Sequence, residues 1–104
     1  MENVTLKKIA KILKKRGYYE MDVKVIGAAD EDSFYEIQCE DKEDVKVLSR
    51  AICKKFNTSV SGVRFNSTKP FECHMKINFE NINVGLFFED DSYELACSAF
   101  GTLC

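Results

Sequence analysis

Few side chains in this sequence of 104 residues could carry acid–base or nucleophilic chemistry. The only histidine is His74, and histidine is the residue most often used for proton transfer near neutral pH. Its neighbour Cys73 suggests a cysteine–histidine pair. However, both lie where apolar and polar residues alternate, and successive residues of a strand point to opposite faces. We therefore expect Cys73 to face the core and His74 to face solvent, which excludes the pair.

The five cysteines are scattered and form no CxxC motif, whereas a zinc site needs four converging ligands. Their odd number favours free thiols in a reducing compartment, because disulfide scaffolds use even counts. We expect Cys39, Cys53 and Cys73 to pack inward and Cys104 to be the exposed thiol. The five glycines are isolated, so no glycine-rich phosphate loop is present. We predict no catalytic residue, no metal and no cofactor, and hence a non-enzymatic protein.

Lysines dominate one face of the first amphipathic segment. Residues 1–16 carry six basic residues and one acidic residue, a net charge of +5, although the whole chain carries −2. This face could contact the phosphates of a nucleic acid, or it could be the solvated side of a helix. It lacks the arginines that read bases and the aromatic residues that stack on them. The candidate nucleic-acid residues are Lys7, Lys8, Lys11, Lys14 and Lys15.

Acidic clusters and paired aromatic residues indicate a second kind of surface. The acids could be solvated loop ends, or they could steer a basic partner. In the aromatic doublets one ring must point away from the core, and exposed aromatic rings among polar residues are typical of an interface, unless the C-terminal segment or a bend covers them. The candidate partner-binding residues are Phe34, Phe87, Glu36, His74, Arg64, Asp30, Glu31, Asp32, Glu89, Asp90 and Asp91.

Two helices are expected to position these groups. Apolar residues recur with helical spacing over residues 6–15, opposite the lysines, and Gly17 suits the left-handed residue that ends a helix. A second helix is capped by Asp41 and ends at Asn57, with acids in its first turn that complement the helix dipole. Its buried residues should be Val45, Leu48, Ala51, Ile52 and Phe56.

Alternation of apolar and polar residues predicts five strands, over residues 19–26, 34–40, 60–65, 71–80 and 84–89. Residues 93–104 fit either a strand or a helix, and we slightly favour a strand. In the helical alternative Asp91 caps the segment and Gly101 ends it.

The expected elements repeat, because a helix followed by two strands occurs twice along the sequence. When the second unit is laid over the first with an offset of 40 residues, Gly17 meets Asn57, Lys14-Lys15 meets Lys54-Lys55, and the core-facing positions of the strands agree. The agreement of buried faces favours a helix–strand–strand duplication, although few residues are identical and chance is the alternative.

The sequence thus predicts one α+β domain over residues 1–104, with a mainly antiparallel sheet of five or six strands and two helices on one face. The element order is α-β-β-α-β-β-β, followed by a strand or a helix. No apolar run approaches the roughly 20 residues that cross a bilayer, so we expect a soluble, cytoplasmic protein that binds no membrane.

We expect a small acidic protein-binding module, such as an inhibitor, immunity-type or adaptor protein, acting through an open sheet face and acidic loops. The expected order is similar, at the level of fold only, to several small acidic binding proteins: secretion chaperones, toxin-immunity proteins and phage-encoded inhibitors. A regulatory protein of a phage or bacterium would fit this comparison. The partner would be another protein or a second copy of the chain. The alternative is a nucleic-acid-binding domain that uses the lysine face.

Overall fold

The first two helices end at residues whose left-handed backbone stops a helix. A computed structural model describes residues 4–27 and 33–103. Helix α1 (Val4–Leu13) continues into a short 3-10 turn, η1 (Lys14–Arg16), and ends at Gly17, whose φ of 85° is left-handed. Helix α2 (Lys42–Phe56) begins where Asp41 accepts a hydrogen bond from the Asp44 backbone and ends at left-handed Asn57. The expected C-terminal ends of both helices and the Asp41 cap are confirmed, whereas α1 begins at Val4, two residues before the expected start.

The five strands form one mixed sheet in the order β1-β2-β5-β4-β3. A 3-10 turn, η2 (Glu20–Asp22), replaces the expected start of the first strand. Three neighbouring pairs are antiparallel (β1–β2, β3–β4 and β4–β5), whereas β2 and β5 run parallel. The sheet is therefore mostly antiparallel. The strands are β1 (Val23–Ile26), β2 (Ser33–Gln38), β3 (Gly62–Asn66), β4 (Phe71–Phe79) and β5 (Ile82–Asp90).

The C-terminal segment is a helix, α3 (Tyr93–Leu103), so our slight preference for a strand was wrong. The Ser92 hydroxyl caps it by accepting a hydrogen bond from the Leu95 backbone, in place of the expected Asp91. Gly101 lies inside the helix and does not end it. The helix is favoured because Ala96 and Leu103 fall on one side and are buried against the sheet.

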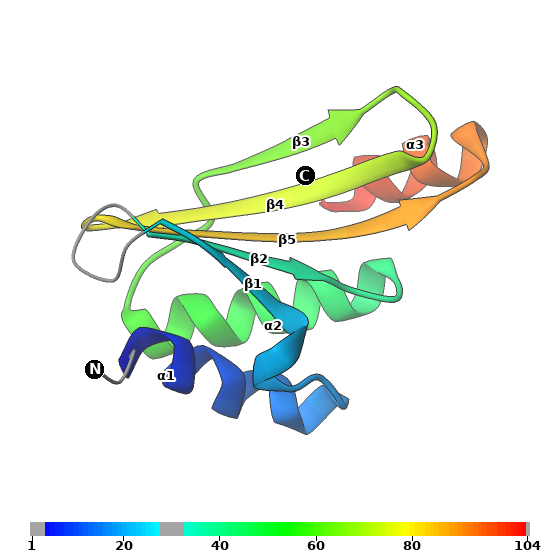
Figure 1. Cartoon of the computed structure of the whole chain (residues 1–104). Helices are drawn as coiled ribbons and strands as arrows, with labels where there is room; N and C mark the ends of the chain where they lie inside the picture. The colour runs from blue at the N-terminus through cyan, green and yellow to red at the C-terminus, as the bar shows by residue number, and fades with distance from the viewer. Residues whose placement is uncertain (1–3, 28–32, 104) are drawn as a thin grey trace.

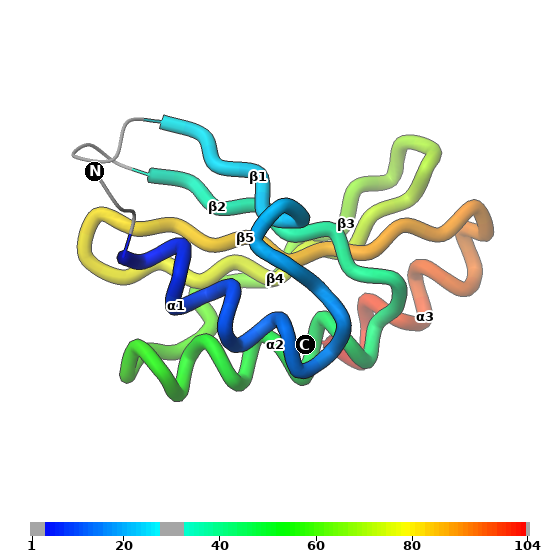
Figure 2. The backbone as a smooth tube through the Cα atoms, turned by 60° about the horizontal axis from the view of Figure 1, so that its bottom comes forward, coloured from blue at the N-terminus to red at the C-terminus, as the bar shows by residue number. Residues whose placement is uncertain are grey.

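All three helices cover the same face of the sheet, and the core lies between them (Figures 1 and 2). The three cysteines that were expected to face the core do so, since Cys39 and Cys73 are buried and Cys53 is half-buried against the core. Cys104 lies outside the described residues. The Cys73 thiol donates to the Ala96 carbonyl oxygen, 3.2 Å away, and so joins α3 to β4. The opposite face of the sheet carries no described helix, and we call it the open face.

The strand order agrees with a duplicated helix–strand–strand unit. The β1–β2 hairpin and the β3–β4 hairpin flank β5 symmetrically, with β1 and β3 at the two edges, and α1 and α2 run in opposite directions beside each other (Figure 1). This arrangement fits an approximate two-fold axis through β5, perpendicular to the sheet. A common origin of the two units stays a prediction.

Replacing Gly17 with Ala is expected to lower the free energy of unfolding by about 1 kcal/mol, because an L side chain is strained at positive φ. No atom lies within 4 Å of the new methyl group, so steric contact adds nothing. The matched control is Gly101→Ala, which also has open space but lies within α3 and should raise stability by up to about 1 kcal/mol. Urea unfolding measures both, and equal effects would contradict the assignment.

Candidate functional site

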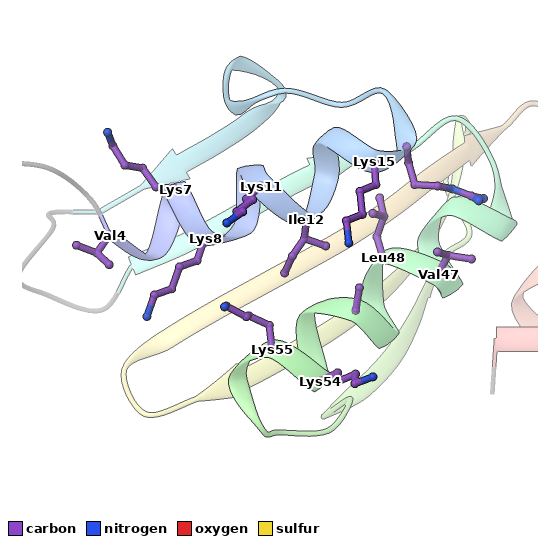
Figure 3. Close-up of a pocket in the computed structure, with 12 residues that line it drawn as sticks. Val4, Lys7, Lys8, Lys11, Ile12, Lys15, Val47, Leu48, Lys54 and Lys55 are labelled. Atoms are coloured by element: carbon purple, nitrogen blue, oxygen red, sulfur yellow. The ribbon is translucent and has the colours of Figure 1, made fainter.

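A groove between α1 and α2 brings together most of the candidate lysines. Its volume is about 870 Å³. Figure 3 shows lysines of α1 and of α2 standing on its two sides, with Ile12 between the two helices. We call this the cationic groove, and it is lined by Val4, Lys7, Lys8, Lys11, Ile12, Lys15, Arg16, Val47, Leu48, Ala51, Lys54 and Lys55.

The cationic groove combines an apolar floor with a basic rim. Seven of its twelve lining residues are Lys or Arg, five are apolar, and none is acidic or aromatic. Lys14, which the sequence grouped with the other lysines, lies in η1 and does not line the groove. Sequence reasoning missed Lys54 and Lys55, because their place beside α1 depends on how the two helices pack. The overlay of Lys14-Lys15 on Lys54-Lys55 was the only signal for them.

A half-buried carboxylate, that of Asp44, joins the two helices that form the groove. One oxygen of Asp44 lies 2.7 Å from the Arg16 guanidinium, and the other accepts a hydrogen bond of 2.6 Å from the Tyr18 hydroxyl. The same hydroxyl accepts a hydrogen bond from the Glu40 backbone. Burial and the Asp44 carboxylate raise the pKa of the Tyr18 phenol, so it remains protonated. Arg16 is therefore held by Asp44, and the lysines supply the charge that a ligand would meet.

The open face carries six of the partner-binding candidates, as their strand registers require: Phe34, Glu36, Arg64, His74, Phe87 and Glu89. Phe87 is nevertheless only 7% exposed, so its expected exposure was wrong. The cause is the imidazole of His74, which stacks on the Phe87 ring with centroids 4.8 Å apart. The stack leaves the His74 side chain only 14% exposed, less than expected for a residue facing solvent.

Phe34 is half-buried on the open face because its ring leans over Gly85. A Cβ atom at Gly85 would lie 3.3 Å from the ring, so a larger residue there would push the ring outward. The two aromatic side chains therefore cover parts of the sheet and do not form a protruding patch. Arg64 and Glu89 are the exposed members of the set, and Glu36 is half-buried.

The acidic residues expected to bind a partner differ in their surroundings. Asp30, Glu31 and Asp32 lie outside the described residues. Asp90 accepts a hydrogen bond from the Ser92 backbone at the turn into α3, whereas Asp91 is exposed. Within the part of the chain that the structure describes, no group of three His, Cys, Asp or Glu residues could hold a metal ion. Over the same residues, no helix is long and apolar enough to cross a bilayer.

A histidine–carboxylate contact on the open face is expected to make stability depend on pH. The His74 imidazole lies 2.9 Å from Glu72 Oε1 and holds the pKa of that carboxyl below its ordinary value of 4.5. A lowered folded-state pKa means that the contribution is present above pH 4.5 and is lost as pH falls through the folded value. We expect the stability difference between the native protein and Glu72→Gln to shrink below pH 4.5 in urea unfolding. A difference that grows on acidification would contradict this.

Thiol reactivity should separate buried from exposed cysteines. Burial raises the pKa of the Cys39 thiol to about 12 and also raises that of Cys73, whereas Cys97 is exposed on α3. We expect iodoacetamide at pH 8 to modify Cys97 at least about 100-fold faster than Cys39 or Cys73, which react only when the protein opens. Peptide mass spectrometry measures the rates, and comparable rates for Cys39 and Cys97 would refute the burial.

Comparison with known proteins gives no family for this chain, since no protein-family model and no curated protein matches it.

Proposed function

We propose that this protein is a non-enzymatic protein-binding module that holds an acidic segment of its partner in the cationic groove. One observation carries the proposal: an apolar floor and a rim with seven basic and no acidic residues lie in the same groove. Such a module suits an inhibitor, immunity-type or adaptor protein, which acts by occupying a partner's surface.

Charge complementarity favours an anionic occupant. The rim lysines lie close together on two helices, and their positive potentials add along the groove and attract negative charge. The apolar floor favours an occupant that also brings apolar side chains, because covering Val4, Val47 and Ala51 removes apolar surface from water. A ligand with both properties gains from both parts of the groove.

A protein segment fits these properties better than a nucleic acid. Single-stranded nucleic acids bind largely by stacking bases on aromatic side chains, and none lines the groove. The single arginine that lines it is paired with Asp44, so it is not available to read a base edge.

The cationic groove is also a better candidate for partner binding than the open face. The open face was expected to bind through exposed aromatic rings, but Phe87 is buried and Phe34 is half-buried. Among the described residues, the only histidine–carboxylate contact on that face joins His74 to Glu72. We therefore assign partner binding to the cationic groove and keep Glu36, Arg64 and Glu89 only as secondary contacts.

Fluorescence anisotropy with the full chain tests the proposal. The probes are labelled peptides of equal Leu and Glu content in several orders, a poly-Glu peptide, and a single-stranded oligonucleotide of about 20 nucleotides. We expect at least one Leu–Glu peptide to bind more tightly than poly-Glu. Its affinity should fall with Lys8→Gln plus Lys55→Gln at the rim and with Ala51→Gln on the floor.

The matched controls remove equal charge or add equal bulk elsewhere. Lys24→Gln plus Lys69→Gln changes two exposed lysines outside the groove, and Ser98→Gln enlarges an exposed residue of α3. Neither should change peptide affinity. Binding of the oligonucleotide alone, lost with the rim variant and unaffected by Ala51→Gln, would replace the proposal with a nucleic-acid-binding function. If no probe binds at low salt, the proposal is wrong.

A further inference from the structure

The shape of the cationic groove specifies the conformation of what it holds. Resting on the proposed function, we infer that the partner segment binds as an acidic amphipathic α-helix, lying along the groove over α1 and α2. Three features of the groove support a helical occupant: the spacing of the lining residues, the lack of backbone partners between the helix ends, and the positions of the lysines.

The lining residues follow the rows by which helices pack together. On α1 one row contains Val4, Lys8 and Ile12, and on α2 one row contains Val47, Ala51 and Lys55. Residues four apart form a ridge along a helix, and a third helix packs its own ridge into the space between two such ridges. The groove between α1 and α2 therefore has the form that accepts a helix.

Between the helix ends, the walls of the groove offer no backbone hydrogen bonds to an extended segment. Its walls are two helices, whose backbone N–H and C=O groups bond within each helix except at the ends. An extended chain over the apolar floor would leave its own backbone groups unpaired, at a cost of about 1–3 kcal/mol for each one buried. A helix satisfies these groups internally, so it is the conformation that can cover the floor.

The lysines define which faces of the bound helix are acidic. Lys7 and Lys11 lie one turn apart on α1 and Lys15 follows in η1, while Lys54 and Lys55 belong to α2 on the other side of the groove (Figure 3). The bound helix should therefore carry Asp or Glu on both sides of an apolar stripe. Residues 4–16 extend for about 20 Å, which corresponds to a partner helix of about 13 residues.

The experiment compares three labelled peptides of about 14 residues with the full chain. The first peptide places Leu at helical spacing, the second has the same composition in an order without helical spacing, and the third is the first with two central residues replaced by Pro. Anisotropy gives the affinity, and circular dichroism gives the helix content gained on mixing. We expect the first peptide to bind at least about tenfold more tightly than the others and to gain helix.

The same variants identify the site of binding. Lys8→Gln plus Lys55→Gln and, separately, Ala51→Gln should each weaken the first peptide by about tenfold, and Lys24→Gln plus Lys69→Gln should not. Thermal unfolding of each variant shows whether it is folded. If the proline peptide binds as tightly as the first, the helical occupant is refuted and the proposed function stands. If no Leu–Glu peptide binds, or only the oligonucleotide does, both are refuted.

Discussion

Replacing Phe87 with Asp is expected to lower the free energy of unfolding by about 4 kcal/mol or more. The substitution removes a ring that is 7% exposed and stacked on His74, and it places an unpaired carboxylate in the same position. A domain of this size has a total stability of roughly 5–15 kcal/mol, so the variant should be close to unfolding. Urea unfolding followed by circular dichroism measures the loss.

Two further variants keep this prediction testable if Phe87→Asp does not fold. Phe87→Leu should cost clearly less, because it retains most of the buried apolar surface. Arg64 is exposed and lies opposite His74 on the open face, so Arg64→Gln should change stability by no more than about 0.5 kcal/mol. A loss below about 1 kcal/mol for Phe87→Asp would mean that the ring is exposed, and it would restore the open face as the leading partner surface.

Replacing Asp44 with Ala is expected to cost about 2–3 kcal/mol and to weaken peptide binding in the cationic groove as well. The carboxylate accepts from the Tyr18 hydroxyl and pairs with Arg16, so its loss leaves a buried hydroxyl with one partner fewer and frees the end of α1 from α2. Tyr18→Phe should cost about 1–2 kcal/mol, because the Glu40 backbone N–H also loses its acceptor.

A double-mutant cycle on these two residues gives the sharper result. Because Tyr18 and Asp44 share one hydrogen bond, the double variant should lose less stability than the sum of the single variants. Glu43→Ala, at the exposed neighbouring position of the same helical turn, is the control and should have a small effect. Strict additivity in the cycle would mean that the contact contributes nothing to the joining of the two helices.

The ends of the first two helices could be predicted from the sequence, because each end depends on a single residue. Gly17, Asp41 and Asn57 each act on the backbone beside them, so their roles can be read without knowing the rest of the fold. The final helix was ambiguous because its short apolar pattern fits both periods. Ser92 was the missed signal, since a serine two residues after the end of a strand is a good helix cap.

The candidate surfaces were harder to predict because they depend on contacts between distant segments. The sequence placed Phe87 on the open face, but its burial depends on the register that sets His74 opposite it on β4. Likewise the sequence pattern identified the lysines of α1 as candidates. The groove itself forms only because α2 lies beside them and contributes Ala51 and Lys55. Neither register nor helix packing follows from the pattern of one segment.

The position of β5 in the sheet has a consequence for synthesis. This strand is the last in the sequence, yet it lies in the centre and separates the β1–β2 hairpin from the β3–β4 hairpin. On the ribosome the two hairpins can emerge and form locally, but they have no shared neighbour until residues 82–90 have left the exit tunnel. The sheet must therefore assemble late, and a nascent chain that stalls before Asp90 would hold two unjoined halves with their inner edges open.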